Sequence, residues 1–137
     1  MAHFEELIAW QKARQLAASV YTVTRSAPWA KDFGLAGQIQ RAAVSIMANI
    51  AEGNERGSSV DYHRFLCMAK GSCAEDRSHL CIAFDIGYLN EDSSHELMKE
   101  ADEVSRLVGG LRAAIARRLS QETLVSPPQP SAPSPQP

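Results

Sequence analysis

Proline is distributed very unevenly along this chain of 137 residues. Six of its seven prolines follow residue 126, whereas the first 119 residues contain only Pro28. Because proline breaks a helix in its interior, a long stretch almost free of it permits long helices. We therefore expect one helical domain over residues 1–119, a usual length for a single domain, and a separate tail over residues 120–137.

The end of this tail, from residue 126, consists only of Pro, Ser, Gln and Ala. Such a stretch cannot bury enough apolar surface to offset the entropy of ordering it, so we expect the tail to be disordered. Its Pro-x-x-Pro spacings would suit an SH3-type groove. No Lys or Arg follows Arg118 to orient such docking, which favours a passive tail.

Four segments of the first 119 residues carry apolar side chains every three or four positions, the pattern of amphipathic helices. They span residues 5–26, 35–53, 60–87 and about 93–119, and nothing reads as a strand. Short connections imply that successive helices are antiparallel neighbours. We predict an all-α, antiparallel, up-down-up-down four-helix bundle. Its expected core consists of Trp10, Ala13, Leu16, Ala17, Val20, Tyr21, Thr24, Leu35, Ile39, Ile46, Ile50, Tyr62, Leu66, Ala69, Cys73, Leu80, Phe84, Leu97, Ala101, Val104, Val108, Leu111 and Ile115.

Turn and capping residues predict where these helices begin and end. The first helix should end before Pro28, since the residue that precedes a proline disfavours the helical conformation. A break is expected at residues 53–57, after which Ser58 or Ser59 can cap the third helix. The sequence Ser-Ser-His-Glu at residues 93–96 matches a capping box for the fourth.

The second segment carries a narrow polar stripe on an otherwise apolar helix. Apolar residues cover more than half of its circumference, so this helix either lies at the centre of the bundle or faces both the core and another subunit. The stripe is either the solvent face, a set paired across helices or subunits, or the lining of a wet channel. We take its residues as candidates for a subunit interface or pore: Gln38, Arg41, Ser45, Asn49 and Glu52.

The charge balance argues against a dedicated nucleic-acid-binding protein. The chain has 14 basic and 16 acidic side chains, a net charge of −2, whereas such proteins depend on a basic surface. A local basic patch remains an alternative. Its candidate residues are Lys12, Arg14, Arg41, Arg56, Arg64, Arg112, Arg117 and Arg118.

The three cysteines indicate a reducing compartment. Cys67, Cys73 and Cys81 are odd in number, show no Cys-x-x-Cys spacing and fall in one expected helix. We expect reduced, buried thiols that pack as small apolar groups. The first residues lack the features of a signal peptide and no apolar run approaches membrane-spanning length, so we expect a cytoplasmic protein.

Metal and catalytic sites are not indicated. The motifs Asp76-x-x-His79 and Asp92-x-x-His95 resemble halves of a di-iron site, but in a helical hairpin their histidines would differ in height by roughly 7 Å. No nucleophile elbow or phosphate loop is present, and Gly109-Gly110 is expected to permit close helix packing. We expect no enzyme activity, no cofactor and no bound metal.

Three acidic residues have positions that call for a partner. Glu52 and Glu75 could form an acid pair, but we favour structural roles in which each accepts hydrogen bonds. Asp76 falls at the edge of an apolar seam, between Cys73 and Leu80. We expect it to be only partly buried or paired with an Arg, since a buried unpaired carboxylate is strongly destabilising.

Several segments resemble the four-helix-bundle family of rRNA intervening-sequence proteins. The most specific contains Gln-x-x-Arg-Ala-Ala-x-Ser-Ile followed by Asn-Ile-Ala-Glu-Gly, within residues 34–53. Others lie at residues 7–13, 71–75 and 87–89, with Leu80 and Ala83. The resemblance covers about residues 3–119. It implies an antiparallel four-helix subunit assembled as a homopentamer, with no catalytic activity.

The same resemblance extends to the accessory protein of diversity-generating retroelements, which binds a reverse transcriptase and nucleic acid. The chain departs from the family pattern at Met47, where proline is common, and at Asp76 and Arg77, where Leu and Glu are usual. Relatives that bind nucleic acid are basic, and this chain is not. Our main hypothesis is a ring-forming scaffold that binds a protein partner, and the alternative is an RNA- or DNA-binding accessory protein that uses a basic patch on the ring.

Overall fold

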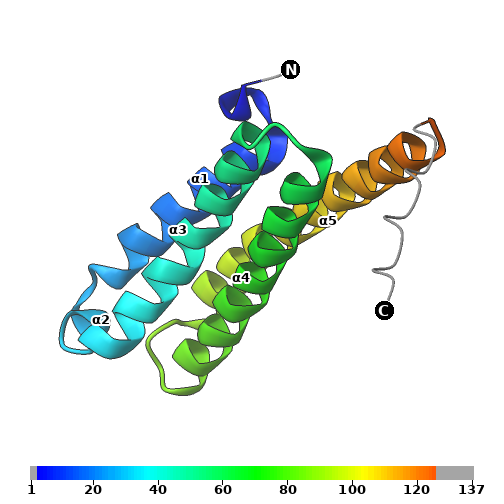
Figure 1. The fold of residues 1–137 in the computed structure, drawn as a ribbon. Helices are drawn as coiled ribbons and strands as arrows, with labels where there is room; N and C mark the ends of the chain where they lie inside the picture. Colours follow the sequence, from blue (N-terminus) through cyan, green and yellow to red (C-terminus); the bar gives the residue numbers. More distant parts are fainter. Residues whose placement is uncertain (1–2, 126–137) are drawn as a thin grey trace, which may run out of the picture.

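The computed structural model describes residues 3–125, and these form an all-helical bundle without a strand (Figure 1). A short 3-10 helix, η1 (Phe4–Glu6), precedes α1 (Ile8–Thr24), the four-residue helix α2 (Ala27–Ala30), α3 (Phe33–Glu55), α4 (Ser59–Asp85) and α5 (Glu91–Val125). Of the four long helices, α1 packs against α3 and α5, and α4 packs against the same two. The predicted antiparallel four-helix bundle is therefore confirmed.

The connection between the first two long helices contains an unpredicted helix. Pro28 lies in the first turn of α2, where its missing N–H and fixed φ are favourable. Trp29 of this helix is fully buried, and its ring lies 5.2 Å from that of Tyr88, centroid to centroid. The Tyr88 hydroxyl donates to the Asp32 carboxylate at 3.0 Å. The short helix therefore closes one end of the core.

Capping residues fix the helix starts, only partly as predicted. Ser58 caps α4 by accepting a hydrogen bond from the Asp61 N–H, as expected. At α5 the cap is Asn90, whose side chain accepts from the Ser93 N–H at 2.7 Å, so the predicted capping box at residues 93–96 is wrong. The break predicted at residues 53–57 is correct only for its last two residues, because α3 continues to Glu55 and α4 begins at Ser59.

The core follows the predicted helix faces closely. The largest fully buried side chains include Leu16, Ile39, Ile46, Leu66 and Val104. Two predicted core residues are instead exposed, Tyr21 by 38% and Phe84 by 45%. Phe84 lies in the last turn of α4.

α5 extends beyond the rest of the bundle. Figure 1 shows its end, drawn in orange, projecting past the start of α1. Leu107 and Leu111 lie beside the first residues of α1, and the segment beyond them lies along the start of α4, where the Ser59 hydroxyl donates to Glu122 at 2.7 Å. Residues 120–125, expected in the tail, are thus helical, and residues 126–137 lie outside the described residues.

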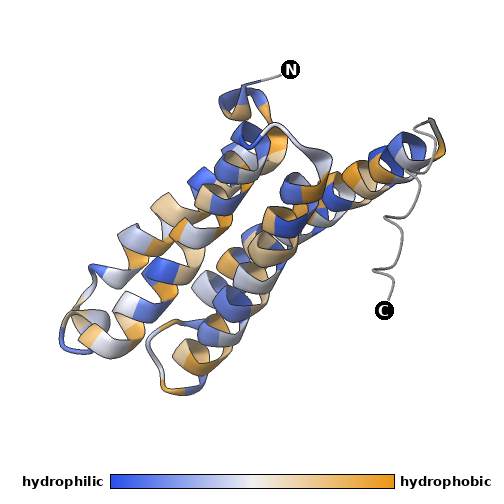
Figure 2. Ribbon diagram, in the orientation of Figure 1, coloured by the Kyte–Doolittle hydropathy of each residue, from blue (hydrophilic) through white to orange (hydrophobic). Residues whose placement is uncertain are grey.

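Hydrophilic and hydrophobic residues are interspersed along α3 and α4 on the side of the bundle shown in Figure 2. No helix within residues 3–125 combines the length and apolar character that crossing a membrane requires.

Candidate interaction surface

The polar stripe of α3 faces the groove between α3 and α4. Its two middle members, Ser45 and Asn49, are half-buried, and the other three are exposed. Ser45 accepts a hydrogen bond from the Ser72 hydroxyl of α4 at 2.9 Å. The Asn49 amide donates to the Ser45 carbonyl at 2.8 Å and to its hydroxyl at 3.0 Å. The middle of the stripe therefore joins α3 to α4, and its two ends remain accessible.

Side chains of α4 complete a polar hollow beside this stripe. Ser72, Glu75 and His79 lie one turn apart along α4 and line a hollow of about 460 Å³ together with Gln38, Arg41, Ala42 and Ser45. We call this surface the α3–α4 face: Gln38, Arg41, Ser45, Asn49 and Glu52 of α3, with Ser72, Glu75 and His79 of α4.

Arg41 is the cation of this hollow. It forms no ion pair with a residue in the described range 3–125. The guanidinium of Arg41 lies over the backbone of the preceding turn, because a Cβ atom on Gly37 would be only 3.0 Å from Nη1 of Arg41. Arg41 therefore has donors free for a carboxylate or phosphate from another molecule.

Apolar side chains accompany the polar groups of the α3–α4 face. Val44 follows Arg41 by three residues and is 39% exposed. On α4, Met68 precedes Ser72 by four residues and Ile82 follows His79 by three, and they are 50% and 45% exposed. Mixed apolar and directed polar groups are the usual composition of a protein–protein contact.

The two glutamates differ in their partners. Glu52 forms an ion pair with Arg56 one turn later at 2.8 Å, which confirms that it accepts hydrogen bonds from an Arg. Glu75 makes no hydrogen bond or ion pair with another residue of the described range 3–125. It therefore presents its carboxylate to the hollow without an intramolecular partner.

The candidate basic residues do not form a single patch. Lys12 pairs with Glu103 at 3.7 Å, and Arg14 lies over the Trp10 ring. Arg41 lies on the α3–α4 face. Arg112, Arg117 and Arg118 follow one another along the end of α5.

Three of the basic residues do gather where α3 ends, α4 begins and α5 projects. The guanidinium carbons of Arg56 and Arg64 lie 5.0 and 5.2 Å from the centre of the Phe65 ring. Burial raises the pKa of Tyr62, and the positive charge of Arg118 opposes that rise, which places Arg118 near the same end. Glu52 and Asp61 neutralise Arg56 and Arg64 in part.

Asp76 lies in the interior of the bundle, contrary to our prediction of partial burial or an Arg partner. Its side chain is fully buried, and neither carboxylate oxygen has a hydrogen-bond partner among residues 3–125. The adjacent Arg77 instead pairs with Asp102 on α5 at 2.9 Å. Burial raises the pKa of Asp76 from 3.8 to about 7. The carboxyl group is therefore far easier to protonate than an ordinary one.

The cysteines are less buried than expected. Only Cys73 lies in the core, where burial raises its pKa to about 11, whereas Cys67 and Cys81 are exposed. The Cys67 sulfur lies 3.8 Å from Nδ1 of His63. Residues 3–125 contain no group of three or more His, Cys, Asp or Glu side chains arranged to hold a metal ion.

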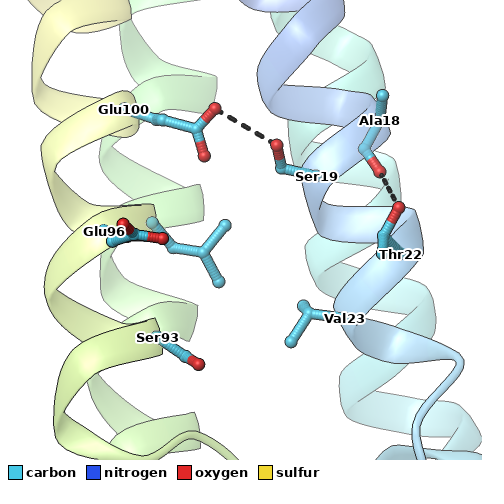
Figure 3. Close-up of a pocket in the computed structure, with 8 residues that line it drawn as sticks. Ala18, Ser19, Thr22, Val23, Ser93, Glu96 and Glu100 are labelled. Atoms are coloured by element: carbon cyan, nitrogen blue, oxygen red, sulfur yellow. Dashed lines mark hydrogen bonds between the residues drawn. The ribbon is translucent and has the colours of Figure 1, made fainter.

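A second hollow, between α1 and α5, was not predicted from the sequence. Figure 3 shows the Ser19 hydroxyl of α1 donating to Glu100 of α5, at 3.1 Å, above Glu96 and Ser93. The hollow measures about 380 Å³. Burial and the nearby carboxylates Glu96 and Glu103 raise the pKa of Glu100. The hydrogen bond from Ser19 lowers this pKa, but by less. The only sequence signal for this hollow was the four-residue spacing of Glu96 and Glu100, which places both on one face of a helix.

Comparison with known proteins agrees with this architecture. A solved structure of a protein of unknown function from the S23 ribosomal protein family of Bacteroides thetaiotaomicron matches with a TM-score of 0.70 and 21% identity, over 77% of this chain and 98% of that one. At this identity the likeness concerns the fold. None of the curated proteins matches. The family model of the 23S rRNA-intervening sequence proteins matches residues 5–110, and the chain therefore belongs to that family.

Proposed function

We propose that the protein is a non-catalytic scaffold whose subunits assemble into a closed ring and that the ring binds a protein partner. The observation that carries this proposal is the α3–α4 face. It combines exposed apolar side chains with Arg41 and Glu75, whose opposite charges have no ion-pair partner within residues 3–125. A contact with a second subunit would bury the apolar groups and give each charge a partner.

Five subunits is the number that the family resemblance implies. A ring requires two different, complementary surfaces on each subunit, because each copy contacts the next in the same way. The α3–α4 face, with Arg41 and Glu75 in one hollow, would be one of these surfaces, and a different face of the next subunit would have to complement it.

The absence of catalysis is part of the proposal. The α3–α4 hollow does contain serine, histidine and glutamate side chains, the types found in hydrolytic sites. However, the Ser72 hydroxyl donates to Ser45, and neither hydroxyl is hydrogen-bonded to His79. A serine nucleophile needs that contact with a base. The hollow therefore favours binding over chemistry.

We also propose that the protein acts in the cytoplasm. Cys67 and Cys81 are exposed free thiols, and Cys73 is a buried one. Exposed thiols persist most readily in a reducing compartment.

Native mass spectrometry tests the ring directly. We expect a particle of five subunits, each of 15.0 kDa. Replacing Val44 and Met68 together by Asp should give monomers, because two charges would then have to be desolvated at the contact. Phe33, which is 84% exposed at the start of α3, offers the control: Phe33→Asp should leave the particle intact. A wild-type monomer at micromolar concentration contradicts the proposal.

The gathering of Arg56, Arg64 and Arg118 at one end of the bundle favours a second function, in which the ring binds RNA or DNA. Two of these arginines have carboxylate partners, and the net charge of the chain is −2. We therefore rank this function below the scaffold.

A further inference from the structure

An apolar groove lies between the start of α1 and the middle of α5. It measures about 420 Å³, and its apolar walls are formed by Leu7, Ile8, Ala9, Leu107, Gly110 and Leu111. Ile8 is 61% exposed, although it is a large aliphatic side chain in the first turn of α1. The groove lies where α1 begins and α5 continues past it (Figure 1).

The walls of the apolar groove carry one charge of each sign, and further positive charges lie beyond them along α5. Glu6 and Arg106 lie at its walls. Further along α5, Arg117 follows Gly110 by seven residues and Arg118 follows Leu111 by seven, so both continue the same helix face two turns on. From residue 104 to residue 121, α5 carries four arginines and no acidic residue.

The arginines that flank the apolar groove are free to bind another molecule. None of Arg106, Arg117 and Arg118 forms an ion pair with a residue of the described part of the chain. The preceding acidic residue of α5, Glu103, is already paired with Lys12. The groove therefore offers an apolar floor with one charge of each sign at its walls, Glu6 and Arg106, unpaired within residues 3–125, and two more arginines about two turns further along α5.

We propose that the apolar groove binds an acidic amphipathic helix of a partner protein. The inference rests on the proposed scaffold function and names the class of partner. The distance along α5 from Leu107 to Arg118 corresponds to roughly 17 Å at 1.5 Å per residue, which is about three turns of a bound helix. Leucine-like side chains on one face of that helix would fill the groove, and its carboxylates would meet the arginines.

The apolar floor favours a protein helix over nucleic acid. A phosphate backbone would pair with the arginines, but it would leave the exposed side chain of Ile8 uncovered. A hydrophobic helix without charge would leave the arginines unpaired. An acidic amphipathic helix is the ligand that uses both features.

The test uses three fluorescent synthetic peptides of about 18 residues with the full-length protein. The first carries Leu at helical spacing and Glu elsewhere. The second has the same composition in an order that places the Leu residues all around the helix, and the third has Lys in place of Glu. We expect the first peptide to bind about ten-fold more tightly than the other two in fluorescence anisotropy, and salt to weaken its binding.

Variants locate the binding site. Ile8→Gln should weaken the first peptide about ten-fold, and the double variant Arg117→Gln, Arg118→Gln should weaken it and reduce its salt dependence. Phe33→Gln and Arg25→Gln are matched controls, because these exposed residues, at the start of α3 and just after the end of α1, lie at the other end of the bundle and should leave binding unchanged. Equal binding of all three peptides, or no effect of Ile8→Gln, overturns the proposal.

Two other outcomes also overturn it. Native mass spectrometry of Ile8→Gln should show the same number of subunits as the wild type, and a change would mean that the groove joins copies of this chain. A duplex DNA probe that displaces the peptide and binds more tightly would assign the arginines to nucleic acid. Because the subunit number of the wild type is measured separately, failure of the ring and failure of the groove are distinguishable.

Discussion

Asp76 is the residue whose surroundings depart furthest from what its chemistry favours. Its carboxyl group, which receives no hydrogen bond from the described part of the chain, lies in the interior of the bundle between the buried residues Cys73 and Leu80. The family resemblance implies Leu at this position, which suits a core. The chain therefore tolerates a polar group that its own fold does not require.

Replacing Asp76 with Leu should leave the protein equally stable or make it more stable. The change removes the cost of burying an unpaired polar group, about 1–3 kcal/mol. Leu is larger than Asp, so overpacking offsets part of this stabilisation if the core cannot adjust. The melting temperature at pH 4, where the folded protein holds the Asp76 proton, is the measurement. Asp76→Val, with a smaller side chain, separates the two effects. Unfolding of both variants would reveal a polar role for Asp76.

Stability should also fall as the pH rises from about 4 to about 7. Between the usual pKa of 3.8 and the raised pKa of about 7, the folded protein holds the Asp76 proton and the unfolded chain has lost it. The free energy of unfolding therefore falls by about 1.4 kcal/mol for each pH unit in this range. This decrease ends above the folded-state pKa, where Asp76 is ionised in both states. The stabilisation is fully present below pH 3.8.

Asp76→Asn isolates this contribution, since the amide does not titrate. The free energy of unfolding of the wild type minus that of the variant should decline across this pH range and become constant above it. Urea unfolding at a series of pH values measures both proteins. A difference that does not vary with pH would mean that Asp76 is ionised throughout.

Single residues were also the hardest to predict from the sequence. Spacing alone placed Asp76 at the seam, but the width of the buried face depends on how closely α3 and α5 approach α4. The same uncertainty explains why Cys67 and Cys81 were wrongly expected to be buried. Helix periodicity indicates which face of α4 is apolar, but both cysteines fall just outside the part of that face that the neighbouring helices cover.

At the scale of the helices, the close approach of α3 and α4 depends on Gly53. A Cβ atom at this position would lie 2.9 Å from Cβ of Phe65 and 3.0 Å from Cδ1 of Tyr62, both on α4. Gly53→Ala should therefore destabilise the protein by about 1–3 kcal/mol, because these neighbours cannot move without separating the helices.

Gly71 is the matched control, because a Cβ atom there would meet nothing within 4 Å. Gly71→Ala should stabilise the protein by about 0.5–1 kcal/mol, as expected for a helix interior. Urea unfolding of the two variants should thus give effects of opposite sign. A neutral or stabilising effect of Gly53→Ala would show that the two helices can separate easily.

The helices themselves were largely predictable, and their ends were not. Four strongly periodic segments gave the four long helices and most of the core. The short helix α2 was missed because four residues are too few for a periodic pattern, and Pro28 was taken as a loop residue. Gly53 was taken as a break, although tertiary packing holds it inside α3.

The candidate site was predictable in part. The stripe of α3 was evident from its spacing, whereas Glu75 and His79 were noted as single residues. Their meeting in one hollow required the pairing of α3 with α4 in a particular register. The apolar groove depends on where α1 begins relative to α5, which no pattern in either helix records.

At the scale of the whole molecule, the acidic balance predicts weak binding of nucleic acid. We expect no binding of generic duplex DNA tighter than roughly 10⁻⁵ M at physiological salt, within or above the usual non-specific range. Fluorescence anisotropy across a salt series measures it, with a long and a short probe, since a ring of modest patches can gain avidity on the long one. Submicromolar binding that Arg117→Ala and Arg118→Ala abolish would contradict the scaffold proposal.

The projecting end of α5 has a geometric consequence for any cyclic assembly. Rotation about a single axis relates all copies in such an assembly, so equivalent points of every subunit lie at the same height. Each α5 extension would then emerge on the same side, as a circle of arginine-bearing helices, and the opposite side would carry the α2 ends of the bundles. The particle would have a front and a back of different chemistry, and only one of them could receive a given partner.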